Sequence, residues 1–462
     1  MGGAETQATR PRRGDELELT IDRLAHGGAG VARSDGYVVF VRGAVPGDRV
    51  RARVGKSKRS FAEAETVELL QPSPDRVEPL APHPGAPWQV LPYELQLREK
   101  EDQVRDALSR IGRFEEPPVE PIVPAVEPLR YRNKLEYSFG EDDEGELVLG
   151  FHQPGRFDVI DDVALDILAS ERVDELREAV KAWCRAEGLT AWDRRAQNGL
   201  LRNLVVREGR RTGQLQARLV TSPGSSFRVE ELAAAAPADS FLLTRAAGVA
   251  ETTREGETRL VKGAAHLEEE LSGLRFRISP DAFFQTNTEM AERLYGSAVE
   301  LAGLSGRERV LDLFCGIGTI ALVLALDAGE VWGVEIVEEA VADAIENARL
   351  NGVDNTSFFA GDVRLAMRPL LERSGRPDVV VVDPPRAGLS QKVVRRVLEA
   401  DADRIVYVSC NPTTLAPNAR QMVDAGYELR TVRPVDMFPQ TPHIECVALL
   451  ERGATRTSAS GH

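Results

Sequence analysis

The chain has 462 residues, of which 42 % are hydrophobic and 28 % charged, with a formal net charge of −15. These proportions are those of a soluble globular protein and exclude collagen, a disordered chain and a disulfide scaffold, while the length predicts two to four domains. No apolar run reaches the ~18–20 residues of a membrane span, and residues 1–13 lack the apolar core of a signal sequence, so we expect a cytoplasmic protein.

The N-terminal part is predicted to form a small β-barrel after a flexible tail at residues 1–14. From residue 15 to residue 72, short β-type runs are broken by glycines and other turn-forming residues. Alternating apolar residues with closely spaced turn signals are typical of a small antiparallel barrel.

The charge of this barrel bears on possible partners. The acidic whole argues against nucleic acid, yet residues 1–72 carry 12 Lys and Arg against 10 Asp and Glu. Arg49, Arg51 and Arg53 alternate with apolar residues, so one strand face would present three arginines together. This face is either an ordinary solvated surface or a phosphate-binding surface, and we favour the second interpretation.

A central α+β domain is predicted over residues 73–275. It begins with an irregular, proline-rich stretch, and residues 93–113 have the pattern of an amphipathic helix that could pack on the catalytic domain. Residues 130–134 form a basic and aromatic cluster, a second candidate for contacting nucleic acid.

Residues 276–452 show clear β/α alternation, followed by a Ser-, Thr- and Gly-rich tail at 453–462. Buried-type strands are expected at residues 310–314, 331–336, 379–385 and 404–410. The order predicts a mostly parallel sheet with helices on both faces, closed by a hairpin of edge strands.

A glycine turn follows the first of these strands at Gly316-x-Gly318. Glycine is needed where the backbone approaches a ligand and turns sharply into a helix. Glu335 ends the next strand, where an acid can accept hydrogen bonds from both ribose hydroxyls of a nucleoside cofactor. The pattern Gly316-x-Gly318-x-x-Ala321 also fits a nicotinamide dinucleotide site. Its place late in the chain favours S-adenosylmethionine.

Chemically able side chains end two further strands. Asp383 stands in Asp-Pro-Pro-Arg, and ligands of open α/β sheets bind beyond the carboxyl ends of the strands. The four cysteines stand singly, so neither a disulfide framework nor a thiolate metal site is predicted. Cys410 alone lies on a strand-ending loop and suits a thiolate nucleophile, with its pKa lowered or its attack coupled to substrate protonation. Glu445 is an acid in an otherwise apolar final strand.

Together these residues resemble a known enzyme family. The motifs are Phe283-Phe284-Gln285-x-Asn287, Asp312-Leu313-Phe314-Cys315-Gly316-x-Gly318, Asp383-Pro384-Pro385-Arg386, Ser409-Cys410-Asn411-Pro412 and His443-x-Glu445, with Tyr131-Arg132-Asn133-Lys134 before them. In this order they resemble the S-adenosylmethionine-dependent RNA 5-methyluridine methyltransferases. Residues 15–72 resemble the family's TRAM domain, an OB-like RNA-binding barrel.

The resemblance implies a Rossmann-like class I methyltransferase domain and a set of site residues. Those expected to line the S-adenosylmethionine pocket are Gln285, Phe314, Glu335, Asp362 and Asp383. Cys410 is implied as the nucleophile that adds to C6 of uracil, and Glu445 as the base that removes the proton from C5 after methylation. Because a stacked base is out of reach, the uridine must be flipped out of its RNA.

The chain departs from the family at two places. Many members hold an iron–sulfur cluster with cysteines near residues 80–90 and near Asp166, where this chain has none. We therefore predict no cluster and a segment held by packing around Trp88 and Tyr93. Thr319 stands where some members have an asparagine beside the cofactor, which puts a cofactor contact there in question.

Two other functions remain open at this stage: a nicotinamide-dependent oxidoreductase, and an RNA-binding protein with a vestigial catalytic domain. The first leaves Cys410 and Glu445 unexplained, and the second is disfavoured because both are present. The RNA could be transfer RNA or large-subunit ribosomal RNA. Nothing in the sequence requires a protein partner or more than a monomer.

Overall fold

The computed structural model describes residues 10–153, 155–156, 158–224, 227–248, 253 and 256–453. The tails predicted at residues 1–14 and 453–462 therefore fall outside the description, apart from residues 10–14 and 453. No helix of the described chain combines the length and the apolar character that crossing a bilayer would take.

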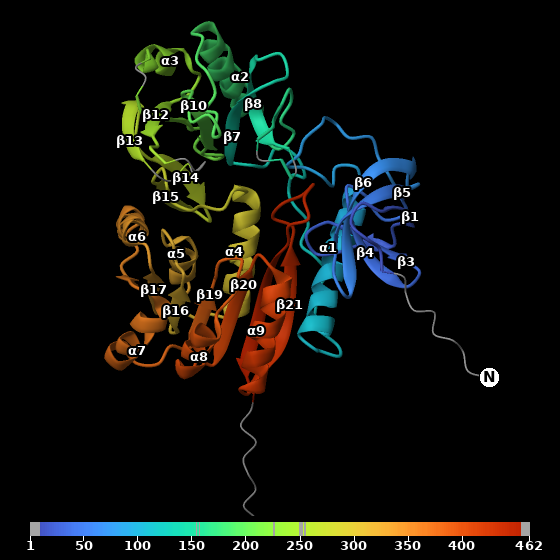
Figure 1. Ribbon diagram of the computed structural model, residues 1–462. Helices are drawn as coiled ribbons and strands as arrows, with labels where there is room; N and C mark the ends of the chain where they lie inside the picture. The colour runs from blue at the N-terminus through green and yellow to red at the C-terminus, as the bar shows by residue number, and fades with distance from the viewer. Residues whose placement is uncertain are drawn as a thin grey trace, which may run out of the picture.

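The N-terminal residues form a six-stranded β unit, drawn in blue in Figure 1. Its strands are β1 (Glu16–Thr20), β2 (Arg23–Leu24), β3 (Gly30–Ser34), β4 (Tyr37–Arg42), β5 (Arg49–Ser57) and β6 (Phe61–Gln71). They pair in the order β1-β5-β6-β4-β3-β2, and small apolar residues such as Val39, Val50 and Ala62 fill the core. The barrel was predicted as antiparallel, but β4 and β6 run parallel, because β5 lies between them in the chain and pairs with β6 from the other side.

The central unit is a second sheet covered by helices (Figure 1). Its strands are β7 (Lys134–Glu141), β8 (Leu147–His152), β9 (Ile160–Asp162), β10 (Leu201–Glu208), β11 (Leu215–Thr221), β12 (Ser240–Arg245) and β13 (Glu257–Lys262). Helices α2 (Glu171–Ala186) and α3 (Val229–Ala235) bury their apolar sides on one core with this sheet. A separate hairpin, β14 (Leu267–Leu271) and β15 (Leu274–Ile278), leads into the third unit.

The third unit is a seven-stranded, mostly parallel sheet. Its strands are β16 (Arg309–Leu313), β17 (Glu330–Glu335), β18 (Thr356–Ala360), β19 (Val379–Val382), β20 (Arg404–Ser409), β21 (Tyr427–Val435) and β22 (Glu445–Arg452). They pair in the order β18-β17-β16-β19-β20-β22-β21. The strand β22 points in the opposite direction to the other six and is antiparallel to both β20 and β21. The predicted Rossmann-like domain and its closing hairpin are therefore confirmed. The chain turns from one side of the sheet to the other between β16 and β19, which is where such sheets bind ligands.

Helices cover both faces of this sheet. The helices are α4 (Thr288–Ala302), α5 (Thr319–Ala325), α6 (Glu338–Leu350), α7 (Val363–Ser374), α8 (Gln391–Glu399) and α9 (Pro412–Asp424). The first three share a core on one face and the last three share a core on the other. Asn287 and Asn411 begin α4 and α9, each accepting a hydrogen bond from a backbone N–H of the first turn.

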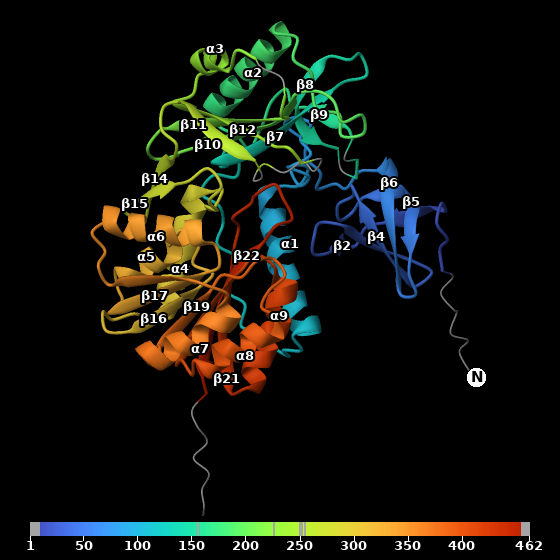
Figure 2. The same cartoon turned by 60° about the vertical axis from the view of Figure 1, so that its left-hand side comes forward.

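A long connection ties the barrel to the catalytic sheet. Helix α1 (Tyr93–Asp106) continues as a π-helix over Ala107–Ile111 and lies between the barrel and α9 (Figure 2). Its residues Val104 and Leu108 belong to the same core as α7, α8 and α9. Beyond it, Val119 and Val123 form β-bridges to β21, so the connection extends the edge of the sheet.

Candidate active site

The predicted site residues of the catalytic domain converge on one edge of its sheet. Phe314, Glu335 and Asp383 follow the carboxyl ends of the parallel strands β16, β17 and β19, and Cys410 follows β20. Glu445 begins β22, and because β22 runs antiparallel to β20, its first residue lies at the same edge. Ser409 pairs with Cys446, so the residues that follow and precede them, Cys410 and Glu445, lie at the same end of this strand pair, and Glu445 acts electrostatically on the Cys410 thiol.

The turn after β16 is held open by left-handed backbone. Phe314, Gly316 and Gly318 have φ angles of 68°, 54° and 83°. A Cβ on Gly318 would come within 3.1 Å of Phe358 and Ala344, whereas one on Gly316 would meet nothing within 4 Å. Gly318 therefore packs tightly against the fold, and Gly316 faces open space that a ligand can enter.

Glu335 is fixed beside this turn by backbone hydrogen bonds. Its Oε2 accepts from Gly316 N–H at 3.1 Å, and its Oε1 accepts from Ile336 and Val337 N–H at 2.7 and 3.0 Å. The carboxylate retains lone pairs for further donors such as ribose hydroxyls.

Asp362 stands at the next strand end and begins α7. It accepts a hydrogen bond from the N–H of Arg364 at 2.8 Å and pairs with the Arg364 guanidinium. The hydrogen bond from that side chain lowers the pKa of Asp362 to about 2, so it is an anion at neutral pH. As an anion it is a ready acceptor for an amino group.

Gln285 is anchored from the central unit. Its backbone carbonyl accepts a hydrogen bond from Nδ2 of Asn133 at 2.9 Å, and the same amide group donates to Thr288 Oγ1 at 2.9 Å. Asn133 belongs to the basic segment predicted to touch RNA, but its side chain is buried and joins the two units.

Three carboxyl groups lie together at the site: Asp312 and Glu445 are buried, Asp383 is half-buried, and the sequence analysis gave Asp312 no role. Asp312 is fully buried within β16, and among the residues that the structure describes neither of its carboxyl oxygens finds a hydrogen-bond partner of ordinary geometry. Burial and the neighbouring Asp383 raise its pKa well above the usual range. Burial also raises the pKa of Asp383 to about 7, and burial together with Asp383 raises that of Glu445. The sequence could have pointed to Asp312 as a candidate site residue, since it is an acid within the otherwise apolar run VLDLF.

Cys410 is half-buried beside these acids. Burial, with Glu445 and Asp383 adding to it, raises the pKa of its thiol to about 11. The prediction of a lowered thiol pKa is therefore wrong for this structure, because burial and the two carboxyl groups outweigh the opposing effect of Arg386. The alternative, attack coupled to proton transfer, remains.

Thr319 contacts a buried tyrosine beside the carboxyl cluster. Its hydroxyl lies 3.3 Å from the hydroxyl of Tyr295, a buried residue of α4 that is close enough to Asp383, Asp312 and Glu445 for them to raise its pKa. Thr319 thus borders the carboxyl cluster.

One arginine and two histidines lie near the site, and one of the histidines comes from the barrel. Arg386, in the loop after Asp383, acts electrostatically on Cys410 and Glu445 and also on two histidines, His443 and His26. His26 comes from the barrel loop between β2 and β3. A Cβ on Gly28 of that loop would fall 2.9 Å from Pro442, so the loop rests directly on the hairpin that carries His443.

A buried polar network lies where related proteins were expected to hold a cluster. Asp166 accepts hydrogen bonds from His83 Nε2 and from the hydroxyl of Tyr137, each at 2.8 Å, and from the backbone of Leu168. Trp88 packs with Leu24 of the barrel and Leu91. Within the described ranges, no three His, Cys, Asp or Glu side chains are grouped so as to hold a metal ion.

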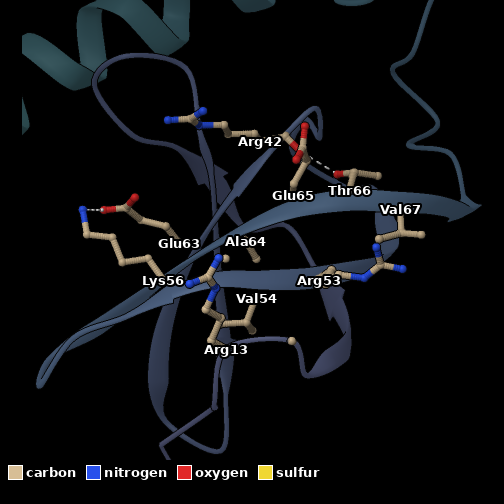
Figure 3. Close-up of a pocket in the computed structure, with 12 residues that line it drawn as sticks. Arg13, Arg42, Arg53, Val54, Lys56, Glu63, Ala64, Glu65, Thr66 and Val67 are labelled. Carbon is tan, nitrogen blue, oxygen red and sulfur yellow. Dashed lines mark hydrogen bonds and ion pairs between the residues drawn. The ribbon is translucent and has the colours of Figure 1, made fainter. Parts of the chain in front are cut away.

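The predicted arginine face exists, but its charge is neutralised. Arg49 pairs with Glu18 at 2.8 Å, Arg51 with Glu68 at 2.5 Å and Arg53 with Glu16 at 2.8 Å. Beside this face, and sharing Arg53 with it, a groove of about 540 Å³ is lined by four basic side chains together with Glu63 and Glu65, and Glu63 pairs with Lys56 (Figure 3). The basic residues are Arg13, Arg42, Arg53 and Lys56.

Comparisons with known proteins agree with this geometry. A tRNA (uracil-5-)-methyltransferase family model matches residues 244–453, and a TRAM domain model matches residues 10–67. An uncharacterised RNA methyltransferase of Halalkalibacterium halodurans is 40 % identical over 95 % of this chain and 97 % of its own, and one of Chlorobaculum tepidum is 40 % identical over 97 % and 99 %. The crystal structure of the Pyrococcus abyssi tRNA (uracil-54, C5)-methyltransferase with S-adenosyl-L-homocysteine is 29 % identical over 94 % of this chain and 100 % of its own, with a TM-score of 0.77.

Proposed function

The chain belongs to the S-adenosylmethionine-dependent RNA (uracil-5-)-methyltransferase family, and on that premise we propose that it methylates a uridine of RNA through a covalent bond between Cys410 and C6 of the base. Glu445 is the base that resolves the adduct. A nicotinamide-dependent oxidoreductase and a vestigial enzyme are both set aside, because the family and its relatives are RNA methyltransferases.

The residues at the sheet edge fit the methyl donor. Gly316 leaves open space at the turn, Glu335 has lone pairs for a ribose, and Asp362 is an anionic acceptor suited to the adenine amino group. Asp383 and Gln285 complete the proposed pocket. S-adenosylmethionine supplies an electrophilic methyl group there.

The proposed roles of Cys410 and Glu445 follow from what uracil chemistry requires. C5 of uracil is a weak nucleophile until the Cys410 sulfur adds to C6 and makes C5 electron-rich. Because the thiol is protonated at neutral pH, its proton passes to the carbonyl oxygen O4 of the base as the S–C6 bond forms, and is released when C5 takes the methyl group. Once C5 carries the methyl group, Glu445 takes the C5 proton, the C6–S bond breaks and the electron pair returns to Cys410. A positioned base contributes typically ~10²–10⁴-fold to such a step.

One observation carries this proposal: Cys410 directly follows β20, Glu445 begins the adjacent antiparallel strand β22, and Glu445 and Asp383 both act electrostatically on the Cys410 thiol. Opposed residues of an antiparallel pair have Cβ atoms about 4.5–5.5 Å apart. A nucleophile and a base at such a spacing can act on adjacent carbons of one ring.

The substrate is an RNA uridine, and we favour transfer RNA over large-subunit ribosomal RNA. The matched structure acts on tRNA uracil-54, and the matching family model is the tRNA (uracil-5-)-methyltransferase model. The groove of the barrel and the cations at the mouth of the site are the proposed contacts for the RNA backbone.

Trapping the adduct tests the mechanism. We expect Glu445→Gln protein, incubated with S-adenosylmethionine and tRNA that lacks 5-methyluridine, to form a protein–RNA band that survives a denaturing gel. Cys410→Ala should give neither this band nor transfer of labelled methyl groups to RNA.

The controls separate the two residues. Cys446→Ala, which removes the buried thiol next to Glu445, should form product like the parent protein. Methyl transfer by Cys410→Ala above the enzyme-free level would refute Cys410 as nucleophile, and normal turnover by Glu445→Gln would refute Glu445 as base. Ribosomal RNA run in parallel decides between the two substrates.

A further inference from the structure

The carboxyl cluster of Asp312, Asp383 and Glu445 has a single cationic neighbour in the described chain, one charge for three acids. Asp312 and Glu445 are 0 % and 4 % exposed. Arg386 acts on Glu445, and no lysine or arginine of the described residues acts on Asp312 or Asp383. For Asp312 the single favourable contact is the nearby N–H of Ala321.

Buried carboxylates without a partner are too costly to keep ionised, so such groups bind protons instead. In the free protein Asp312 and Glu445 are therefore largely neutral at pH 7, as their raised pKa values also indicate, and Asp383, with its pKa raised to about 7, is neutral in about half of the molecules. A neutral Glu445 cannot accept a proton, although the proposed reaction needs it to do so.

We propose that the sulfonium charge of the methyl donor is the missing partner of this cluster, so that binding S-adenosylmethionine expels a proton that binding S-adenosylhomocysteine does not. This rests on the proposed place of the donor beside Asp383, and not on the Cys410 adduct. The two ligands differ by one methyl group and one positive charge, and a fixed cation within a few ångströms favours the ionised form of a carboxyl group.

The timing suits the reaction. When C5 forms its bond to the methyl carbon, sulfur keeps the electron pair of the broken S–C bond and becomes neutral. Glu445 thereby loses the neighbouring cation and regains its affinity for a proton, just when the C5 proton has to be removed. The proton expelled on donor binding is thus replaced by the one taken from the substrate.

Other ionisable groups facing the cluster do not mimic this effect. The pKa values of Cys315, Tyr295, Tyr407 and Cys446 are raised by burial, so these groups stay neutral below pH 8. The remaining neighbours are Glu335, Cys410 and Arg386, and Arg386 also acts on His26 and His443. Burial lowers the pKa of both histidines, that of His443 to about 4, so His443 stays neutral between pH 5.5 and 7.0.

Calorimetry with the full chain measures the expelled proton directly. S-adenosylmethionine and S-adenosylhomocysteine are titrated at pH 6.5 in two buffers of different ionisation enthalpy, where the amino groups of both ligands remain protonated. We expect S-adenosylmethionine to release about one proton more. Between pH 5.5 and 7.0 its affinity relative to S-adenosylhomocysteine should rise by up to about tenfold per pH unit. Equal proton counts for the two ligands would overturn the proposal.

Variants assign the proton to the cluster. Asp312→Asn, which mimics the neutral acid, should fold and reduce the excess released by S-adenosylmethionine. Asp354→Asn, on the exposed loop before β18, should leave it unchanged. An analogue with an amine in place of the sulfonium serves as a second cation and should behave like S-adenosylmethionine. If Glu445→Gln traps no adduct while the proton excess persists, the covalent mechanism fails and this inference stands.

Discussion

Cys410 is more accessible than the other three cysteines, but its thiol is difficult to ionise. It is half-buried, whereas Cys184, Cys315 and Cys446 are buried. Since its pKa is raised to about 11, only a small fraction of the thiol is ionised at neutral pH, and that fraction grows about tenfold per pH unit. We therefore expect iodoacetamide to modify Cys410 first, about tenfold faster for each unit from pH 7 to pH 9, as measured by mass spectrometry of the peptides.

The same experiment on Cys410→Ala is the control, and it should leave the protein nearly unmodified over this range. A rate for Cys410 that does not change with pH would mean that its thiol is already ionised, against the electrostatics of the site. Faster modification of Cys446 would mean that the edge of the sheet opens.

At the level of single residues, the sequence predicted positions better than charge states. Asp383 and Cys410 were identified because they follow buried strands, and parallel strands end at one edge whatever their detailed packing. The raised thiol pKa and the role of Asp312 depend on which acids become neighbours, and sheet order decides that. Arg386 and His26 were missed as a pair because 360 positions separate them in the chain.

Among the elements, α1 carries a buried ion pair that fixes the loop before Glu445. Lys100 and Asp436 are both fully buried, with Nζ 2.5 Å from Oδ1, and Nζ also donates to the carbonyl of Phe438 at 3.0 Å. Tyr93 donates to the other oxygen of Asp436 at 2.8 Å. Removing one partner of a buried pair typically costs about 3–5 kcal/mol. We expect Lys100→Met to lower the melting temperature of the catalytic domain clearly, as followed by calorimetry.

The double variant Lys100→Met/Asp436→Asn is the matched control for this pair. It removes both charges, so it should recover much of the loss, because no unpaired buried carboxylate remains. Equal destabilisation in the single and double variants would show that packing of the lysine stem, and not the charge, holds α1 in place.

Elements with a strong local pattern were predicted, and those that depend on distant partners were not. The strands that form the centre of the catalytic sheet are continuous apolar runs. β18 was missed because Thr356–Ala360 is only partly buried and follows a polar turn. The β-bridges of Val119 and Val123 to β21 join segments about 310 residues apart, and a proline-rich sequence gives no sign of them.

For the whole molecule, the question is how an acidic protein holds RNA. The ladder of Arg49, Arg51 and Arg53 is matched by glutamates, whereas Arg13 and Arg42 in the neighbouring groove are exposed (Figure 3). Each phosphate contact to a flexible strand contributes about 0.7 to the slope of log affinity against log salt. We expect Arg13→Ala/Arg42→Ala to weaken tRNA binding and to reduce that slope by about 1–2, as measured by fluorescence anisotropy at several salt concentrations.

A paired arginine provides the comparison. Arg49→Ala/Glu18→Ala removes a cation together with its acid and should leave the slope unchanged. If this double variant flattens the slope as much as the groove variant does, the ladder exchanges its glutamates for phosphates on binding. The face of Arg49, Arg51 and Arg53 would then be a phosphate-binding surface, the interpretation favoured from the sequence.

The barrel also reaches the reaction centre through His26. Its loop rests on Pro442, and its ring lies near Arg386 and His443, with Nδ1 buried and without a hydrogen-bond partner. Burial and Arg386 lower the pKa of His26 in the free protein. A phosphate beside it would favour the charged form and oppose that effect.

RNA should therefore bind the parent protein more tightly as the pH falls from 7.5 to 6, and His26→Ala should lose part of that gain. We expect KM for tRNA to rise about 3- to 10-fold in His26→Ala, equivalent to about 1 kcal/mol, with kcat and S-adenosylhomocysteine affinity unchanged. Arg33→Ala, which removes an exposed cation of β3, should leave KM at the parent value. A KM for His26→Ala equal to that of the parent protein would mean that the barrel makes no contact near the flipped base.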